Sequence, residues 1–284
     1  MADIFEVGIV GSGIMGAGLA EVAAKSGHHV VVRSRTQANA DAVLTRINKG
    51  LDKQVAKEKI TEDDRDSILA RIRVTDHLGQ LAGCDLVIES VVEDLAVKRG
   101  LFEELEQIVK PGGILATNTS TLPVVEMAVA TQRPELVCGI HFFNPAPVMD
   151  LVEIVKPVTA SDDTISRAVA FAERCGKDPI VVEDRAGFVV NALLFPYLNN
   201  AVRMLETGTA SMEAIDTAMV GGCGFPMGPF KLLDLVGLDT SLSILDALYD
   251  EFRDPNYAAV PTLRRMVTAG RLGRKSGSGF YDYS

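Results

Sequence analysis

The chain has 284 residues, of which 47% are hydrophobic and 23% charged, and its formal net charge is −10. This length accommodates two ordinary domains, and the composition is that of a globular protein and excludes an intrinsically disordered one. Because an acidic protein repels polyanions at long range, we expect no nucleic acid partner and no anionic membrane surface as a partner.

The sequence also indicates a compartment. No apolar run approaches the roughly 20 residues of a membrane helix, and residues 1–6 lack the basic segment and apolar stretch of an export signal. The four cysteines are far apart and form no C-x-x-C pair, which argues against a zinc site and a disulfide framework. We therefore expect a cytoplasmic protein with reduced thiols and without a metal or a membrane segment.

Short β-branched runs alternate with helical stretches over the first 184 residues. A helix is expected over residues 14–25, and strands are expected over residues 7–10, 30–32, 86–89, 114–116 and 136–141. Strands that alternate with helices predict a parallel sheet covered by helices. We therefore expect the α/β class, with a Rossmann-type doubly wound sheet.

The pattern changes near residue 185. Apolar residues recur at helical spacing over 188–206, 212–219 and 230–248, and glycines and prolines interrupt the pattern over 221–229. We therefore expect a dinucleotide-binding domain in residues 1–184 and an all-helical domain, for substrate binding and dimerisation, in residues 185–284. The strongly apolar first helix suits a buried position or a subunit interface, so we expect a homodimer formed through the helical domain.

A glycine-rich turn follows the first expected strand and opens the first expected helix. Its sequence has the G-x-G-x-x-G spacing, in which the first glycine permits a tight turn, the second lets the backbone approach a pyrophosphate, and the third lets helix and strand pack closely. The free N–H groups of the helix then face the anion. A glycine turn without a ligand is the alternative. The cofactor contacts expected here are Gly11, Gly13, Ile14, Met15 and Gly16.

The second strand ends without the acidic residue that binds the ribose 2′-hydroxyl of NAD. Ser34 stands at that place, between Arg33 and Arg35. The planar fork of an arginine matches the oxygens of a 2′-phosphate. We therefore expect NADP(H) to be favoured over NAD(H). The alternative is that both arginines are solvated surface charges and either cofactor binds.

His141 follows an apolar run and precedes a proline-rich loop, at the carboxyl end of an expected strand where ligands of α/β sheets gather. Oxidation of an alcohol by hydride transfer needs a base for the hydroxyl proton, and histidine has the intrinsic pKa for this role. Glu153 lies twelve residues further on, in a second β-like run, where its carboxylate could fix the imidazole tautomer. From spacing alone, a structural histidine remains the alternative.

The sequence resembles the short-chain L-3-hydroxyacyl-CoA dehydrogenase family, which includes the bacterial 3-hydroxybutyryl-CoA dehydrogenases. The resemblance covers essentially the whole chain, and its most specific part is His-Phe-Phe-Asn-Pro with a glutamate twelve residues after the histidine. It implies an NAD(P)-dependent dehydrogenase that interconverts (S)-3-hydroxyacyl-CoA, with 3-hydroxybutyryl-CoA as the expected substrate, and 3-ketoacyl-CoA. The matching stretches are residues 11–16, 87–93, 117–120, 141–145, 187–191, 226–229 and 275–281.

The resemblance also implies residue roles. His141 is the general acid/base and Glu153 its orienting partner, Ser120 bonds the C3 oxygen of the substrate, and Asn191 bonds the histidine or the substrate across an interdomain cleft. Further positions that resemble the family's cofactor contacts are Glu93, Lys98, Asn144 and Lys275. The alternatives are that Ser120 caps a helix, that Asn191 is an ordinary buried amide, and that Lys98 is a solvated helix charge.

A basic stripe is expected on the helix that begins after the second strand. Arg46, Lys49, Lys53 and Lys57 are spaced three, four and four residues apart, so they share one helix face. In an acidic protein such a face suits the phosphates of coenzyme A, and related enzymes bind coenzyme A in this segment. We expect Lys49 and Lys53 to make this contact; a solvated helix face is the alternative.

Two other interpretations compete with this one. The first is a β-hydroxyacid dehydrogenase of the 3-hydroxyisobutyrate type, which shares the glycine turn and the Ser-Arg-Thr of residues 34–36. Those enzymes use a lysine on the long interdomain helix, where this chain has Asn191 and no early lysine. The second is a non-enzymatic, crystallin-like relative, which the intact set of His141, Glu153, Ser120 and Asn191 disfavours.

Overall fold

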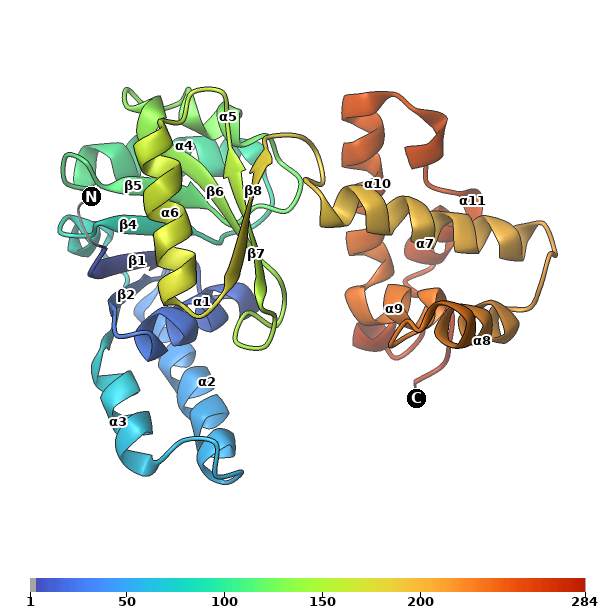
Figure 1. Ribbon diagram of the computed structural model, residues 1–284, viewed down its shortest axis with the longest axis horizontal. Coiled ribbons are helices and arrows are strands. Elements are labelled where there is room, and N and C mark those ends of the chain that lie inside the picture. Colours follow the sequence, from blue (N-terminus) through green and yellow to red (C-terminus); the bar gives the residue numbers. More distant parts are fainter. Residues whose placement is uncertain (1–3, 284) are drawn as a thin grey trace. The chain divides into compact units, whose positions relative to one another are not determined.

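The computed structural model describes residues 4–283, and Figure 1 traces them. The first three residues, on which part of the expectation about the N-terminus rests, lie outside this range. The chain divides into two compact units, residues 1–184 and 185–284. The first is an α/β unit and the second is helical, which confirms the predicted fold class.

The first unit is built on an eight-stranded sheet with the order β3-β2-β1-β4-β5-β6-β7-β8. Neighbouring strands are parallel, except that β6 and β7 are antiparallel. The strand order reverses between β1 and β4, and such a switch point is where doubly wound sheets bind ligands. The strands are β1 (Glu6–Val10), β2 (His29–Arg33), β3 (Ile72–Thr75), β4 (Leu86–Glu89), β5 (Ile114–Thr117), β6 (Val137–Phe142), β7 (Leu151–Lys156) and β8 (Asp178–Glu183).

Helices cover this sheet and bury its central strands, so that every residue of β4, β5 and β6 is buried. Continuous apolar runs are the signature of strands covered on both faces, which is why these strands were predicted to within a residue or two. The helices are α1 (Ile14–Lys25), α2 (Gln37–Val55), α3 (Glu62–Ala70), α4 (Leu95–Ile108), α5 (Val124–Ala128) and α6 (Asp162–Arg174).

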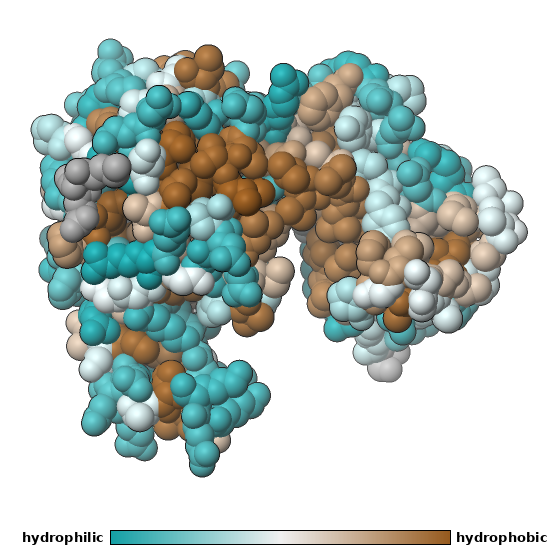
Figure 2. Space-filling model, viewed as in Figure 1, coloured by the Kyte–Doolittle hydropathy of each residue, from teal (hydrophilic) through white to brown (hydrophobic). Residues whose placement is uncertain are grey.

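Strand β8 was not predicted, and its place in the sheet and its composition explain why. It forms an edge of the sheet, and Ile180 and Val181 are exposed there, which Figure 2 shows as an apolar area over β8 in the first unit. It also begins with Asp178 and Pro179, two residues that are depleted in strands. Its β-branched run, residues 180–182, is therefore short and follows two residues that are unfavourable in strands.

The second unit packs its helices around their own apolar core, which includes Phe195, Phe230 and Leu245. The expected continuous helical stretch over residues 230–248 is wrong, because Gly237, with a φ of +102°, divides it into two helices. The helix expected from residue 188 begins at Val190, since Gly187 and Phe188 both have positive φ. The helices are α7 (Val190–Glu206), α8 (Met212–Cys223), α9 (Pro229–Val236), α10 (Leu238–Phe252) and α11 (Pro261–Thr268).

Within residues 4–283, no helix combines the length and apolarity that a membrane span needs. In the same range, no group of three or more histidine, cysteine, aspartate or glutamate side chains is arranged to hold a metal ion. All four cysteines are free thiols, and three of them are buried.

Candidate active site

The glycine turn connects β1 to α1 with the geometry of a phosphate-binding loop. Gly11 has a φ of +133°, and a Cβ at this position would lie 2.1 Å from the Ser90 carbonyl oxygen. A Cβ at Gly16 would lie 2.1 Å from the carbonyl oxygen of Gly11, so this glycine lets α1 approach the turn. A Cβ at Gly13 would meet nothing within 4 Å. The turn is thus tight on its protein side and open above the helix N-terminus, which fits a pyrophosphate.

The end of β2 lies beside this turn. Ser34 is 5% exposed, and its hydroxyl donates a hydrogen bond of 2.8 Å to Ser12 Oγ, within the glycine turn. Arg46 Nη1, from α2, donates a bond of 3.1 Å to the carbonyl oxygen of Ser12. The structure therefore places Arg46 at the turn, whereas sequence analysis assigned it to the basic stripe for coenzyme A. Arg33 Nε donates instead to a carbonyl in the loop after β3, at 3.3 Å, and Arg35 is exposed.

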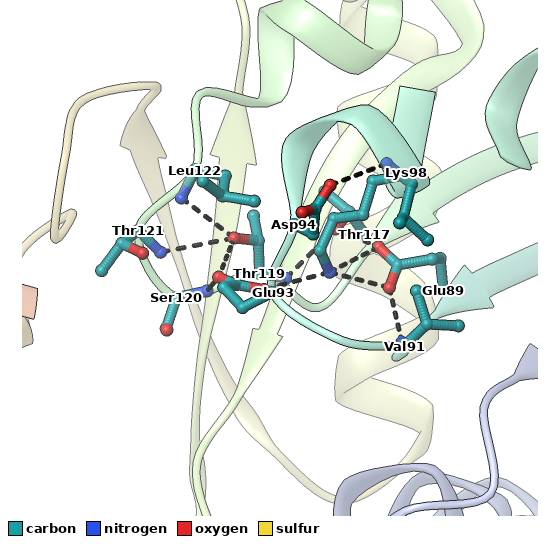
Figure 3. Close-up of polar contacts among 11 residues, drawn as sticks. Glu89, Val91, Glu93, Asp94, Lys98, Thr117, Thr119, Ser120, Thr121 and Leu122 are labelled. Atoms are coloured by element: carbon teal, nitrogen blue, oxygen red, sulfur yellow. Dashed lines mark hydrogen bonds and ion pairs between the residues drawn. The ribbon is translucent and has the colours of Figure 1, made fainter. Parts of the chain in front are cut away.

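A buried carboxylate ends β4. Glu89 is fully buried and accepts hydrogen bonds from Lys98 Nζ at 2.7 and 2.9 Å, from Thr117 Oγ1 at 2.7 Å and from the backbone N–H of Val91 at 2.6 Å (Figure 3). Lys98 comes from α4 and is 1% exposed. The alternative of a solvated helix charge at Lys98 is therefore wrong, because a buried ammonium must be paired.

Glu93 lies in the loop after β4 and is the third charged member of this group. Its Oε2 lies 3.1 Å from Lys98 Nζ, while its Oε1 accepts from the Thr119 hydroxyl and, at 3.1 Å, from the Ser120 backbone N–H (Figure 3). The side chain of Glu93 is 39% exposed. The loops after β4 and β5 are thus tied together, and the position of Ser120 depends on Glu93.

His141 and Glu153 form a cross-strand pair. They stand opposite each other in the register of β6 and β7, and Nδ1 of the imidazole lies 2.7 Å from Oε2 of the carboxylate. The Glu153 side chain is fully buried and that of His141 is 7% exposed. The ring also lies 4.5 Å from the ring of Phe143, centroid to centroid. Packing and a charge-assisted hydrogen bond therefore hold the imidazole in one orientation.

The loop after β6 carries Asn144, which is exposed. Lys177 stabilises this loop, since its Nζ donates hydrogen bonds to the carbonyl oxygens of Ala146 and Met149 at 2.9 and 2.8 Å. Lys177 is 8% exposed. The sequence gives no indication of this contact, because no local pattern shows that a lysine more than 25 positions further along folds back to these carbonyls.

Two predicted site residues belong to the second unit. Asn191 lies in the first turn of α7 and is 7% exposed. Lys275 lies in the 3₁₀ helix Arg274–Ser276, and its Nζ forms an ion pair with the Asp239 carboxylate, 2.7 Å from Oδ2. Gly237 makes room for this pair, because a Cβ there would lie 3.0 Å from Lys275 Nζ.

The basic stripe on α2 is shorter than predicted. The helix ends at Val55, so Lys57 lies beyond it, and Arg46 turns to the glycine turn. Lys49 and Lys53 remain on the exposed face of α2. The surface of the α2–α3 arm is mostly hydrophilic (Figure 2, lower left).

An imidazole that is hydrogen-bonded to a carboxylate, in a domain whose sheet and glycine turn suit a dinucleotide, is typical of dehydrogenases that oxidise alcohols. The comparison with family models specifies which one. Residues 6–185 match the NAD-binding domain of 3-hydroxyacyl-CoA dehydrogenase, and residues 187–283 match the C-terminal domain of the same enzyme. The chain belongs to the 3-hydroxyacyl-CoA dehydrogenase family, as the sequence resemblance implied, and is an oxidoreductase.

Individual relatives cover the whole chain. A 3-hydroxybutyryl-CoA dehydrogenase of Mycobacterium tuberculosis is 47% identical over 286 residues, which span 100% of both chains. The crystal structure of M. tuberculosis FadB2 matches with a TM-score of 0.98 at 47% identity, again over 100% of both chains. The structure of (S)-3-hydroxybutyryl-CoA dehydrogenase PaaH1 from Ralstonia eutropha matches with a TM-score of 0.97 at 41% identity, over 99% of this chain and 100% of that one. These similarities do not favour the two competing interpretations, a β-hydroxyacid dehydrogenase and a non-enzymatic, crystallin-like relative.

Proposed function

We propose that the protein interconverts (S)-3-hydroxyacyl-CoA and 3-ketoacyl-CoA by hydride transfer at C3, with 3-hydroxybutyryl-CoA as its substrate. The observation that carries this proposal is the buried pair of His141, near the carboxyl end of β6, and Glu153, within β7. Similarity over the full chain to proteins named 3-hydroxybutyryl-CoA dehydrogenase supports the choice of substrate.

The imidazole moves the proton of the substrate hydroxyl. Its Nδ1 faces the Glu153 carboxylate at 2.7 Å, an acceptor, so Nδ1 carries the hydrogen and Nε2 is the basic nitrogen. During oxidation, Nε2 takes the proton of the C3 hydroxyl as the C3–H bond breaks. A nicotinamide cofactor, when bound, supplies the acceptor of that hydride, and in the reverse direction its donor. Glu153 stabilises the imidazolium that forms.

Two further side chains act on the substrate. The Ser120 hydroxyl bonds the C3 oxygen, and this loop is held in position because Glu93 binds the Ser120 backbone N–H. The Asn191 amide, at the start of α7, bonds the histidine or the substrate. A hydrogen bond to the C3 oxygen stabilises the charge that develops there when the proton leaves.

The cofactor occupies the glycine turn, and NADP(H) is preferred over NAD(H). Ser34 stands where an acidic residue would repel a 2′-phosphate, and Arg46 lies at the same turn, so its guanidinium joins Arg33 and Arg35 as a candidate phosphate ligand. The remaining proposed contacts are Gly11, Gly13, Ile14, Met15, Gly16, Glu93, Lys98, Asn144 and Lys275.

The acyl-CoA phosphates bind Lys49 and Lys53 on the exposed face of α2, where two cations offset the acidic charge of the protein. The helical unit forms a homodimer, and exposed apolar residues on α7, Leu193 and Met204, support this.

The protein resides in the cytoplasm, where four free thiols stay reduced.

The test is a spectrophotometric assay of cofactor oxidation with acetoacetyl-CoA, run with NADPH and with NADH. We expect turnover that depends on acetoacetyl-CoA. The same protein assayed with 3-hydroxyisobutyrate and the oxidised cofactors should show none. Turnover of the hydroxyacid without turnover of acetoacetyl-CoA would replace this proposal with the β-hydroxyacid alternative.

A further inference from the structure

The charges of three side chains between the end of β4 and the first turns of α4 do not cancel. Glu89 and Glu93 both contact the single ammonium of Lys98, at 2.7 and 3.1 Å. No other cation is paired with Glu89 or Glu93 among residues 4–283. We call these three residues the charge trio. Two carboxylates and one ammonium leave a net charge of −1.

The position of Glu89 determines where this excess negative charge lies. Glu89 is fully buried and contacts Lys98 through both oxygens, so the Lys98 charge is largely neutralised from inside the protein. Glu93 shares the same ammonium through one oxygen only, and its side chain is 39% exposed. Its other oxygen faces the backbone of Ser120. The unbalanced charge of the trio therefore lies at the exposed end, on Glu93.

The topology places this end beside one half of a bound dinucleotide. A doubly wound sheet binds a dinucleotide across the switch point, here between β1 and β4, with one mononucleotide on each side. Ser34, at the end of β2, marks the side of the adenosine ribose. The nicotinamide half must then lie over β4 to β6, the side that also carries His141.

We propose that the charge trio of Glu89, Lys98 and Glu93 makes the site discriminate between redox states of its cofactor, by stabilising the bound oxidised nicotinamide relative to the reduced one and so raising the ratio Kd(reduced)/Kd(oxidised). The oxidised ring carries a positive charge and the reduced ring is neutral, while the rest of the cofactor has the same charge in both states. A net negative group near the ring therefore stabilises the oxidised form selectively. This inference rests on the proposed binding of a nicotinamide cofactor, and it holds for NAD and NADP alike.

Glu89 is the positioning residue in this arrangement. It is too deeply buried to contact a ligand, and without its charge Lys98 would pair with Glu93 alone, leaving no net charge. A Glu89→Gln variant should therefore lose the discrimination although the altered side chain contacts no cofactor.

The experiment measures the dissociation constants of the oxidised and reduced cofactor by calorimetry, for the cofactor pair that binds more tightly. We expect Glu93→Gln to lower the ratio Kd(reduced)/Kd(oxidised) by about fivefold, the effect of one partly screened charge at close range. Glu89→Gln should lower the ratio comparably, and Glu93→Asp, which keeps the charge, should retain most of it. Added salt should lower the wild-type ratio towards that of Glu93→Gln.

Asp162→Asn is the matched control, because it removes one negative charge from the same unit at a side chain that is 92% exposed, and it should leave the ratio unchanged. If Glu93→Gln weakens both redox forms by the same factor, the trio only shapes the loop and the inference is overturned. If neither NAD nor NADP binds the wild-type protein, the proposed function itself fails, and this inference with it. Glu93 is partly exposed, so its variants keep the test available should Glu89→Gln not fold.

Discussion

His141 and Glu153 face each other across the antiparallel junction of β6 and β7, with 2.7 Å between Nδ1 and Oε2. Side chains at paired positions of neighbouring strands lie within hydrogen-bonding reach, as those of Glu89 and Thr117 also do across the parallel pair β4 and β5. The one antiparallel pairing in the described sheet thus coincides with its acid/base pair.

Glu153→Gln should lower kcat by about two orders of magnitude. The amide oxygen can still accept the Nδ1 hydrogen and hold the tautomer, but the charge that stabilises the imidazolium is lost. Cofactor Kd should stay within twofold of the wild-type value. Glu126→Gln, which neutralises a carboxylate on α5 whose side chain is 43% exposed, serves as the control. A Glu153→Gln enzyme with wild-type kcat would show that the carboxylate has no part in the chemistry.

Ser34→Asp should shift the cofactor preference towards NADH by at least about tenfold in kcat/KM. The new carboxylate would bond the ribose 2′-hydroxyl of NADH and repel the 2′-phosphate of NADPH. The measurement is kcat/KM for both cofactors with acetoacetyl-CoA. A wild-type protein that already prefers NADH tenfold would end the assignment of NADP(H).

Arg46→Gln should lower kcat/KM for NADPH several-fold and leave the value for NADH within twofold, since only NADPH has the phosphate that the guanidinium binds. Lys59→Gln, which removes one positive charge at an exposed position beyond the end of α2, is the matched control and should leave both cofactor values unchanged. Equal losses for both cofactors in Arg46→Gln would mean that the residue only supports the turn through the Ser12 carbonyl.

Lys53→Glu should raise KM for acetoacetyl-CoA about fivefold and spare the Kd of the cofactor, because it replaces a cation with an anion where the coenzyme A phosphates are proposed to bind. Lys59→Glu serves as the control, because it makes the same charge change at an exposed position outside α2. An unchanged KM in Lys53→Glu would remove this residue from the substrate site.

The stability of the fold should depend on His28 under acid conditions. Burial, with the positive charge of Arg174 as a second cause, lowers the pKa of His28 from 6.5 to about 4. Between these values the unfolded chain binds a proton that the native protein does not, so the free energy of unfolding falls as the pH falls from 6.5 towards 4. At 1.36 kcal/mol per pKa unit, this loss of free energy of unfolding is at most about 3.4 kcal/mol.

Urea denaturation at pH 7 and pH 5 of the wild type, His28→Leu and the exposed His29→Gln tests this prediction. His28→Leu should lose less stability between the two pH values than the wild type does, and His29→Gln should follow the wild type. Parallel losses in the wild type and His28→Leu would contradict the assignment of this pH dependence to His28.

The sequence predicted those parts of the structure that depend on local patterns of residues. Buried β-branched runs indicated β1, β2 and β4 to β6, and the position of His141 and Glu153 in successive β-like runs indicated their pairing. The edge strand β8 was missed because its β-branched run, residues 180–182, is short and follows Asp178 and Pro179. The end of α9 was missed because the helical spacing continues through Gly237.

The rest of the site depends on contacts that periodicity does not encode. Helical spacing placed Arg46 on the face of Lys49 and Lys53 but gave no sign that the Ser12 carbonyl lies within its reach. Similarly, Glu89 lies in a stretch that resembles the family, yet only the folded chain brings Lys98 and Thr117 to its buried carboxylate.

The central claim is that His141 transfers the proton of the C3 hydroxyl. The single-turnover rate of acetoacetyl-CoA reduction by His141→Ala, with reduced cofactor prebound at saturation, tests this claim most directly. A fall of about two to four orders of magnitude with an unchanged cofactor Kd is predicted, while His77→Ala, at a side chain that is 83% exposed, should react like the wild type. A His141→Ala protein that reduces acetoacetyl-CoA at the wild-type rate would contradict the account.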